Sequence, residues 1–242
     1  MYVLGFAASY FLILKQPKAQ RLGLKGAVLQ DLFFYAAIGL IVGARLGYIL
    51  FYQLSSFSDY LQHPLEIIAI WHGGMSFHGG LIGALLAGIL FCRRRRLPYW
   101  EVADTVMVTA PIALCLGRIG NFINGELFGR ATEVPWAMVF PSGGPIPRHP
   151  SQLYEAALEG LLLFIILWKL KDREFRPGTL VSVFLVGYGA FRFIIEFFRQ
   201  PDPQVGLLWN FLSMGQVLCL AMIITGFILY RFLPKTPQQH KQ

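Results

Sequence analysis

Long apolar stretches separated by short basic clusters constrain this chain more than any other feature of its sequence. The stretches cover residues 2–14, 31–52, a segment ending at 92, 102–116, 153–168, 180–198 and 207–233. A transmembrane helix needs about 20 mainly apolar residues. Only 14% of the residues are charged, against about 25% in soluble domains. The sequence predicts an all-α polytopic integral membrane protein with about seven transmembrane helices, built as one transmembrane domain over residues 1–242.

The basic residues predict which side of the membrane each loop faces. Fifteen of the 21 lysines and arginines lie at residues 15–25, 93–96, 169–176 and 231–241, whereas residues 53–70 contain none. Cytoplasmic loops carry an excess of lysine and arginine. We therefore expect the N-terminus outside and the C-terminus inside. The net charge of +8 is divided among these clusters, so it does not indicate a nucleic-acid partner. A lipid-headgroup or nucleic-acid patch at residues 93–96 is the alternative to a purely topological role.

A proline- and glycine-rich loop over residues 129–150 contains Trp136, Met138, Val139 and Phe140. These side chains would be costly if they were all fully exposed. We expect this loop to be ordered, as a small loop region on the outer face of the protein.

The stretch over residues 117–129 gathers polar residues where the neighbouring chain is nearly all hydrocarbon. It contains Arg118, Asn121, Asn124 and Glu126, and it ends at Gly129. Polar clusters at membrane depth are costly and are found where they line a cavity or bind something. A guanidinium group beside amide donors and glycine backbone suits an anion, such as a phosphate. We expect this stretch to join the fourth span, over residues 102–116, to the loop that follows it.

A second polar set follows one face of the helix expected over residues 180–198. Tyr188, Arg192, Glu196 and Arg199 are spaced by four, four and three residues, so their side chains share that face. A purely structural ion pair between Arg192 and Glu196 is the alternative to a binding function.

His78 lies among five glycines at the start of a membrane helix. Glycines leave room for a ligand, and histidine exchanges protons near neutral pH. We favour a functional role for His78 and leave His72 open. Asp104 is predicted either to pair with an arginine or to cap the helix that it begins, and Ser151 to be an N-cap. Six arginines lie outside the basic clusters and are candidates for chemistry: Arg45, Arg118, Arg130, Arg148, Arg192 and Arg199.

Four motifs occur in a fixed order along the chain. They are SFHGGL at residues 76–81, GRIGNFINGE at 117–126, RHPSQLYE at 148–155 and GYGAFR at 187–192. Through them the whole chain resembles the bacterial prolipoprotein diacylglyceryl transferases. The family also implies residues ahead of the first span, including a tyrosine needed for activity, in whose place this chain begins at Met1.

The resemblance implies an enzyme of the bacterial inner membrane whose active site faces the periplasm. It would transfer the diacylglyceryl group of phosphatidylglycerol to the lipobox cysteine of a prolipoprotein signal peptide. A thioether would form and glycerol phosphate would leave, with no metal or cofactor. His78, Arg118 and Arg192 are the predicted catalytic residues. The predicted substrate-binding residues are Arg118, Asn121, Asn124, Glu126, Gly129, Tyr188, Arg192, Glu196 and Arg199.

The alternative function is that of a transporter or flippase for an anionic lipid, without covalent chemistry. Such a protein would also require arginines within the membrane, but it would usually show internal repeats. We find no convincing repeat between the two halves. A non-catalytic membrane scaffold would not require His78, Arg118, Arg192 and Glu196 together.

Overall fold

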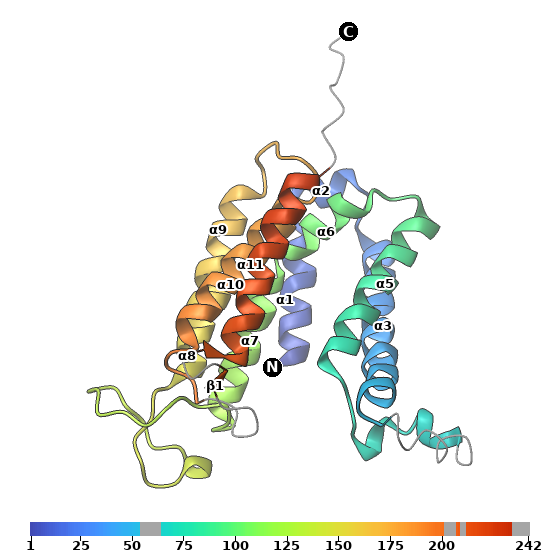
Figure 1. Ribbon diagram of the computed structural model, residues 1–242. Coiled ribbons are helices and arrows are strands. Elements are labelled where there is room, and N and C mark those ends of the chain that lie inside the picture. Colours follow the sequence, from blue (N-terminus) through green and yellow to red (C-terminus); the bar gives the residue numbers. More distant parts are fainter. Residues whose placement is uncertain (54–63, 201–206, 209–211, 234–242) are drawn as a thin grey trace. The chain divides into compact units, whose positions relative to one another are not determined.

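The computed structural model describes residues 1–53, 64–200, 207–208 and 212–233 (Figure 1). The chain forms two compact units. The larger unit contains Met1–Gln20 and the chain from Ala103 onward, and the smaller contains Arg21–Val102. We describe each unit by itself. The single transmembrane domain expected over residues 1–242 stays a prediction.

Four helical stretches within the described residues are long and apolar enough to cross a membrane. They are Gly26–Phe51, Phe77–Arg95, Tyr99–Ile123 and Met214–Phe232. Two shorter apolar helices cover Val3–Leu14 and Thr179–Ile195. This pattern is that of a multi-pass membrane protein. The expected number of about seven crossings and their orientation stay predictions.

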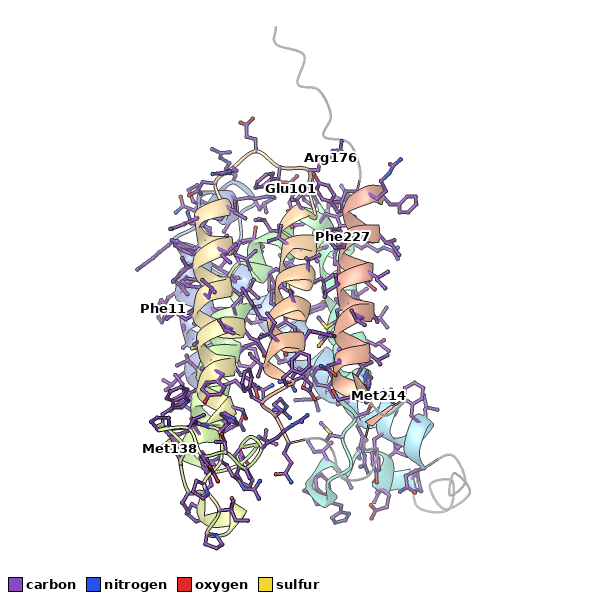
Figure 2. All side chains as sticks on the ribbon, turned by 60° about the vertical axis from the view of Figure 1, so that its left-hand side comes forward. Phe11, Glu101, Met138, Arg176, Met214 and Phe227 are labelled. Atoms are coloured by element: carbon purple, nitrogen blue, oxygen red, sulfur yellow. The ribbon has the colours of Figure 1, made fainter. Side chains whose placement is uncertain are left out.

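The larger unit is a helical bundle. Its helices are α1 (Tyr2–Leu14), α2 (Pro17–Arg21, at the boundary), the end of α6 (Tyr99–Met107), α7 (Ala110–Ile123), α8 (Ser151–Glu155), η5 (Ala156–Leu162), α9 (Leu163–Leu170), α10 (Thr179–Ile195) and α11 (Met214–Phe232). Helix α7 packs against α1 and η5, and α10 packs against α11. A short antiparallel hairpin of β1 (Leu207–Leu208) and β2 (Leu212–Ser213) precedes α11. Phe11 and Phe227 point outward (Figure 2), as expected for helices that face lipid.

Helix α7 continues seven residues beyond the end predicted for the fourth span. The fourth span was predicted to end at Leu116, but α7 ends at Ile123. Arg118 and Asn121 therefore lie on its last turns. Glycine weakens a helix only by about 1 kcal/mol, and packing overrides that preference. Gly120 faces Met1 so closely that a Cβ atom there would lie 2.9 Å from Met1 Cγ.

Asp104 holds the beginning of α10 in place. Its carboxylate accepts hydrogen bonds from the backbone N–H groups of Gly178 (2.9 Å) and Val181 (3.1 Å). Lys18 Nζ lies 3.5 Å from the same carboxylate, which is almost fully buried. The predicted arginine partner is wrong, because the basic partner is Lys18. A helix cap is present, but the capped helix is α10 and not the helix to which Asp104 belongs. A carboxylate at a helix N-terminus binds free N–H donors and favours the helix dipole.

The smaller unit is built on the helix pair α3 (Gly26–Tyr52) and α5 (Phe77–Arg95), with the one-turn helices η2 (Pro64–Ile67) and η3 (Ile70–His72) between them. The two long helices touch through glycines. A Cβ atom on Gly83 would lie 2.0 Å from the Gly39 carbonyl oxygen, and one on Gly43 would lie 2.4 Å from the Gly79 carbonyl oxygen. The four-residue glycine spacing of α3 thus lets the two backbones meet directly.

Candidate functional site

Three arginines surround one glutamate in the larger unit. Glu155 Oε2 lies 2.6 Å from Arg118 Nε and 3.0 Å from Arg192 Nη1. Glu155 Oε1 accepts a 2.7 Å hydrogen bond from Arg199 Nη1. The arginines come from α7, the end of α10 and the segment after α10. Glu155 therefore joins three parts of the chain at one point.

Two further glutamates complete this cluster. Arg192 lies 3.6 Å from Glu159 and 3.4 Å from Glu196, and Arg199 lies 3.5 Å from Glu196. Tyr188 is hydrogen-bonded to Glu159. The ion pair between Arg192 and Glu196 exists, but it is one contact in a network. We call Arg118, Arg192, Arg199, Glu155, Glu159 and Glu196 the arginine–glutamate cluster.

A π-helical segment carries the acidic side of the cluster. Residues 151–170 form one continuous helical run in which η5 is π-helical. Glu155 lies immediately before η5, and Glu159 lies within it. Such segments are rare and occur often at functional sites. Helix α7 approaches this segment at Gly160, where a Cβ atom would lie 2.5 Å from Cys115 Cβ. Arg118 is one turn beyond Cys115, so this approach brings it to Glu155.

The arginines lie on the accessible side of the cluster. The side chain of Glu155 is 0% exposed, whereas that of Arg118 is 22% exposed and those of Arg192 and Arg199 are 16% exposed. An anion that arrives from outside therefore meets guanidinium groups before carboxylates. Arg118 contacts Glu155 through Nε, and its side chain remains partly accessible. Guanidinium groups held in this way are suited to a phosphate.

The polar side chains of the 117–129 stretch contact one another. The amide groups of Asn121 (2.8 Å) and Asn124 (3.3 Å) donate to Glu126 Oε1. These hydrogen bonds lower the pKa of Glu126 below its ordinary value. Glu126 is exposed, so its carboxylate remains accessible on its other side.

Two fully buried side chains hold the turn that follows Glu126. Gln152 Nε2 donates to the Glu126 carbonyl oxygen (2.7 Å), and Ser151 Oγ donates to the Leu127 carbonyl oxygen (3.2 Å). Leu127 has a positive φ of 58°, which is uncommon for a residue other than glycine. The predicted N-cap role of Ser151 is wrong, because Pro150 occupies the N-cap and the Ser151 hydroxyl bonds the turn instead.

Gly129 joins the loop over residues 129–150 to the end of α10. Its N–H donates to the His149 carbonyl oxygen, and a Cβ atom there would lie 2.4 Å from the Phe198 carbonyl oxygen. Arg130 Nε donates to the Arg199 carbonyl oxygen at 2.6 Å. Arg148 stacks on Phe128 and donates to Gln200. These contacts position Arg199, whereas neither Arg130 nor Arg148 is part of the cluster.

His78 and Arg45 belong to the smaller unit, whereas the arginine–glutamate cluster belongs to the larger unit. His78 is exposed in the first turn of α5, whose N-cap is Ser76. Arg45 is buried and donates to backbone carbonyl oxygens of four residues: Glu66, Ile67, Gly73 and Gly74. The guanidinium group of Arg45 thus holds the segment that leads into α5. His72 pairs with Glu66 at the surface.

Glu155 and Glu159 were not predicted as site residues. Both are acids in a helix of low polarity, and they are four residues apart. That spacing was the signal by which they could have been found. Their arginine partners lie 33 to 44 residues away, and periodicity within one helix does not reveal such contacts.

The fold and the cluster define a multi-pass membrane protein with a buried arginine–glutamate site. The family model of the prolipoprotein diacylglyceryl transferases matches residues 1–232. Relatives named phosphatidylglycerol–prolipoprotein diacylglyceryl transferase include that of Desulfotalea psychrophila, 52% identical over 236 residues (95% of this chain and 86% of the relative). That of Geobacter sulfurreducens is 51% identical over 229 residues (95% and 87%), and that of Bordetella bronchiseptica is 48% identical over 241 residues (99% and 91%). The chain belongs to the prolipoprotein diacylglyceryl transferase family.

Proposed function

We propose that this chain is a transferase that moves the diacylglyceryl group of phosphatidylglycerol to the lipobox cysteine of a prolipoprotein. The cysteine sulfur attacks the glyceryl carbon that bears the phosphate ester. A carbon–sulfur bond forms, the carbon–oxygen bond breaks, and glycerol phosphate leaves with the bonding electrons. The thiol proton passes to a base or to the departing phosphate.

The observation that carries this proposal is the convergence of three arginines on Glu155. Charge builds up on the phosphate as the carbon–oxygen bond breaks, and preorganised donors at that place are usually the largest contribution to catalysis. Arg118 and Arg192 bind this phosphate, and Arg199 supports its charge. Glu155 fixes the guanidinium groups from behind, since it is buried and they are partly accessible.

The remaining predicted residues have roles around this phosphate. Asn121, Asn124 and Glu126 bind the glycerol headgroup, whose hydroxyl groups match amide and carboxylate partners. Tyr188 orients Glu159, and Glu196 orients Arg192. Gly129 fixes the segment that carries Arg199. His78 accepts the thiol proton, because a thiolate is the nucleophilic form of cysteine.

The proposed topology has seven crossings in the bacterial inner membrane, with the N-terminus outside and the C-terminus inside. The active site and the loop over residues 129–150 face the periplasm. Within the larger unit, Arg176 lies at one end, and Met138 and Met214 lie towards the other (Figure 2), which supports placing the basic loop inside. The partners are phosphatidylglycerol, the lipobox signal peptide and membrane lipid. Nucleic acid is not among them.

The experiment is a transfer assay with purified protein, phosphatidylglycerol labelled in its diacylglyceryl part and a lipobox peptide beside its Cys→Ser version. We expect label on the cysteine peptide alone, and its loss in Arg118→Ala but not in Arg173→Ala, which removes an exposed loop arginine. Movement of labelled lipid from one leaflet of a vesicle membrane to the other, with no thioether formed on the peptide, would contradict the proposal and favour the transporter.

A further inference from the structure

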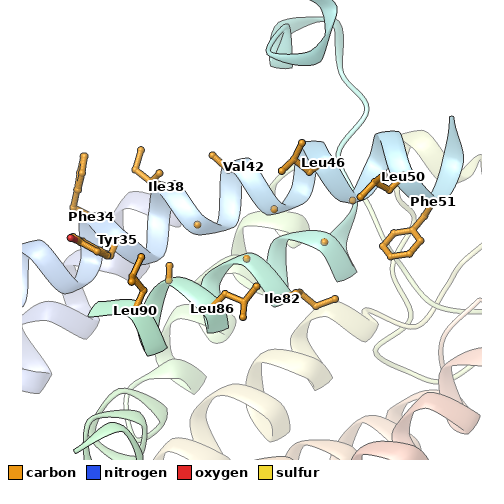
Figure 3. Close-up of a pocket in the computed structure, with 16 residues that line it drawn as sticks. Phe34, Tyr35, Ile38, Val42, Leu46, Leu50, Phe51, Ile82, Leu86 and Leu90 are labelled. Carbon is orange, nitrogen blue, oxygen red and sulfur yellow. The ribbon is translucent and has the colours of Figure 1, made fainter. Parts of the chain in front are cut away.

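An apolar groove runs along the paired helices of the smaller unit. It has a volume of about 680 Å³ and lies over the glycine contact between α3 and α5 (Figure 3). Its walls are rows of large aliphatic side chains at four-residue spacing, such as Ile38 and Val42 on α3 and Leu86 and Leu90 on α5. Among the lining residues only Tyr35 has a polar side chain.

The groove is as long as a lipid chain requires. Its lining residues span 34–51 of α3, which corresponds to about 25 Å at 1.5 Å per residue. One leaflet contributes about 15 Å of hydrocarbon depth. An extended acyl chain therefore fits along the groove with contact on both walls. The volume also lies within the ordinary range of ligand pockets, about 300–1,000 Å³.

One end of the groove meets a cluster of arginines. Leu90 is one turn before Arg94, and Arg94 Nη1 donates to the hydroxyl group of Tyr35 at 2.9 Å. Arg95 pairs with Asp31. All four side chains of Arg93–Arg96 are exposed. This end therefore keeps a positive charge beside hydrocarbon.

The backbone conformation at this end disfavours the arginine that occupies it. Arg96 is the C-cap of α5 and has a positive φ of 55°. Glycine is the usual residue in this conformation at a helix end. The arginine is present despite that preference, and its side chain is exposed like that of Arg93. Exposed arginines next to a membrane helix attract anionic lipid headgroups.

We infer that this groove binds an anionic phospholipid of the cytoplasmic leaflet. Its acyl chain lies between the α3 and α5 walls, and Arg93 and Arg96 contact its phosphate. This site is distinct from the arginine–glutamate cluster, to which none of these residues belongs. The leaflet follows from the proposed topology, whereas the binding itself does not depend on transfer chemistry.

The test uses the full chain in phosphatidylcholine vesicles with a trace of photoactivatable lipid. One probe is phosphatidylserine with a diazirine in the acyl chain, and the other is phosphatidylcholine with the same chain. Peptide mass spectrometry locates the labelled residues. We expect the serine lipid to label α3 and α5 along the groove at least tenfold more than the choline lipid. Each basic residue near the surface contributes about fivefold to binding of an anionic lipid.

Two variants and a matched control make the test specific. The double variant Arg93→Gln/Arg96→Gln should reduce labelling by the serine lipid about 20-fold or more. Leu86→Trp, which fills the groove without a change of charge, should reduce labelling by both lipids. Lys169→Gln/Arg173→Gln removes the same charge from the last turn of α9 and the loop after it, in the other unit, and should leave labelling unchanged.

Three results would overturn the inference. They are equal labelling by the two lipids, unchanged labelling in Arg93→Gln/Arg96→Gln, and the absence of label from the groove, which is expected if other parts of the protein cover the groove. The transfer assay is run on the same samples. Arg93→Gln/Arg96→Gln should retain transfer to the lipobox peptide. If transfer is absent in the parent protein while anionic labelling persists, the proposed function fails and the lipid site stands.

Discussion

Arg118 Nε lies 2.6 Å from Glu155 Oε2, although the two residues belong to α7 and α8 and are separated by the loop over residues 129–150. The glutamate is fully buried and the arginine is partly accessible. The contact fixes the direction of the guanidinium group without covering it. An arginine held in this manner loses little entropy when it binds an anion.

Glu155→Gln should impair both stability and transfer. Removal of one partner from a buried ion pair typically costs about 3–5 kcal/mol, and here three arginines lose a shared counter-charge. A displacement of about 1 Å can reduce a rate about 100-fold. Unfolding in detergent and initial transfer rates measure the two effects. Glu155→Asp should recover part of both, and Glu174→Gln, at an exposed loop position, should change neither. Full activity of Glu155→Gln would contradict the positioning role.

Gly83→Ala and Gly88→Ala form a matched pair on α5. A Cβ atom on Gly83 would lie 2.0 Å from the Gly39 carbonyl oxygen, whereas one on Gly88 would meet no atom within 4 Å. Gly83→Ala should separate α3 from α5 and lower the unfolding temperature. Gly88→Ala should be neutral or stabilising by up to about 1 kcal/mol, because alanine favours the helix. Similar unfolding temperatures for the two variants would refute the close glycine contact.

Asp104→Asn should loosen the beginning of α10. The asparagine oxygen can accept from Gly178 or Val181, but its amide group cannot accept at all. One buried N–H group then loses its acceptor, at a cost of about 1–3 kcal/mol. Hydrogen exchange at residues 178–182 should accelerate. Asp172→Asn, which alters a surface pair with Lys171, is the control and should leave exchange there unchanged.

The turn at residues 124–129 should open in acid. Hydrogen bonds from Asn121 and Asn124 lower the pKa of Glu126 in the folded protein. Its contribution to stability is therefore present above the unfolded-state pKa and is lost as the pH falls through the lowered folded-state pKa. Hydrogen exchange of this turn between neutral pH and about pH 3 would follow the loss. In Asn121→Ala the loss should occur at higher pH, and an identical profile would argue against the amide–carboxylate contact.

The long apolar stretches predicted helices that the structure contains. The four-residue spacing of Arg192 and Glu196 on one helix face predicted the contact between them. The predicted end of the fourth span at Leu116 was wrong, because packing at Gly120 keeps α7 helical as far as Ile123. Glu155 could not be predicted in its role because its partners are distant in sequence. The role of Arg118 in substrate binding and catalysis stays a prediction, and only coordinates show that a carboxylate lies behind its side chain.

The arginine–glutamate cluster contains three guanidinium groups and three carboxylates in mutual contact. In its ionised form the assembled cluster has no net charge, whereas each helix that contributes to it carries a charge which lipid disfavours by about 2.5–3.5 kcal/mol. In the proposed topology, helices α7, α8 and α10 therefore stabilise one another within the bilayer. During biosynthesis α7 leaves the ribosome first, and its arginine lacks this counter-charge until α8 follows.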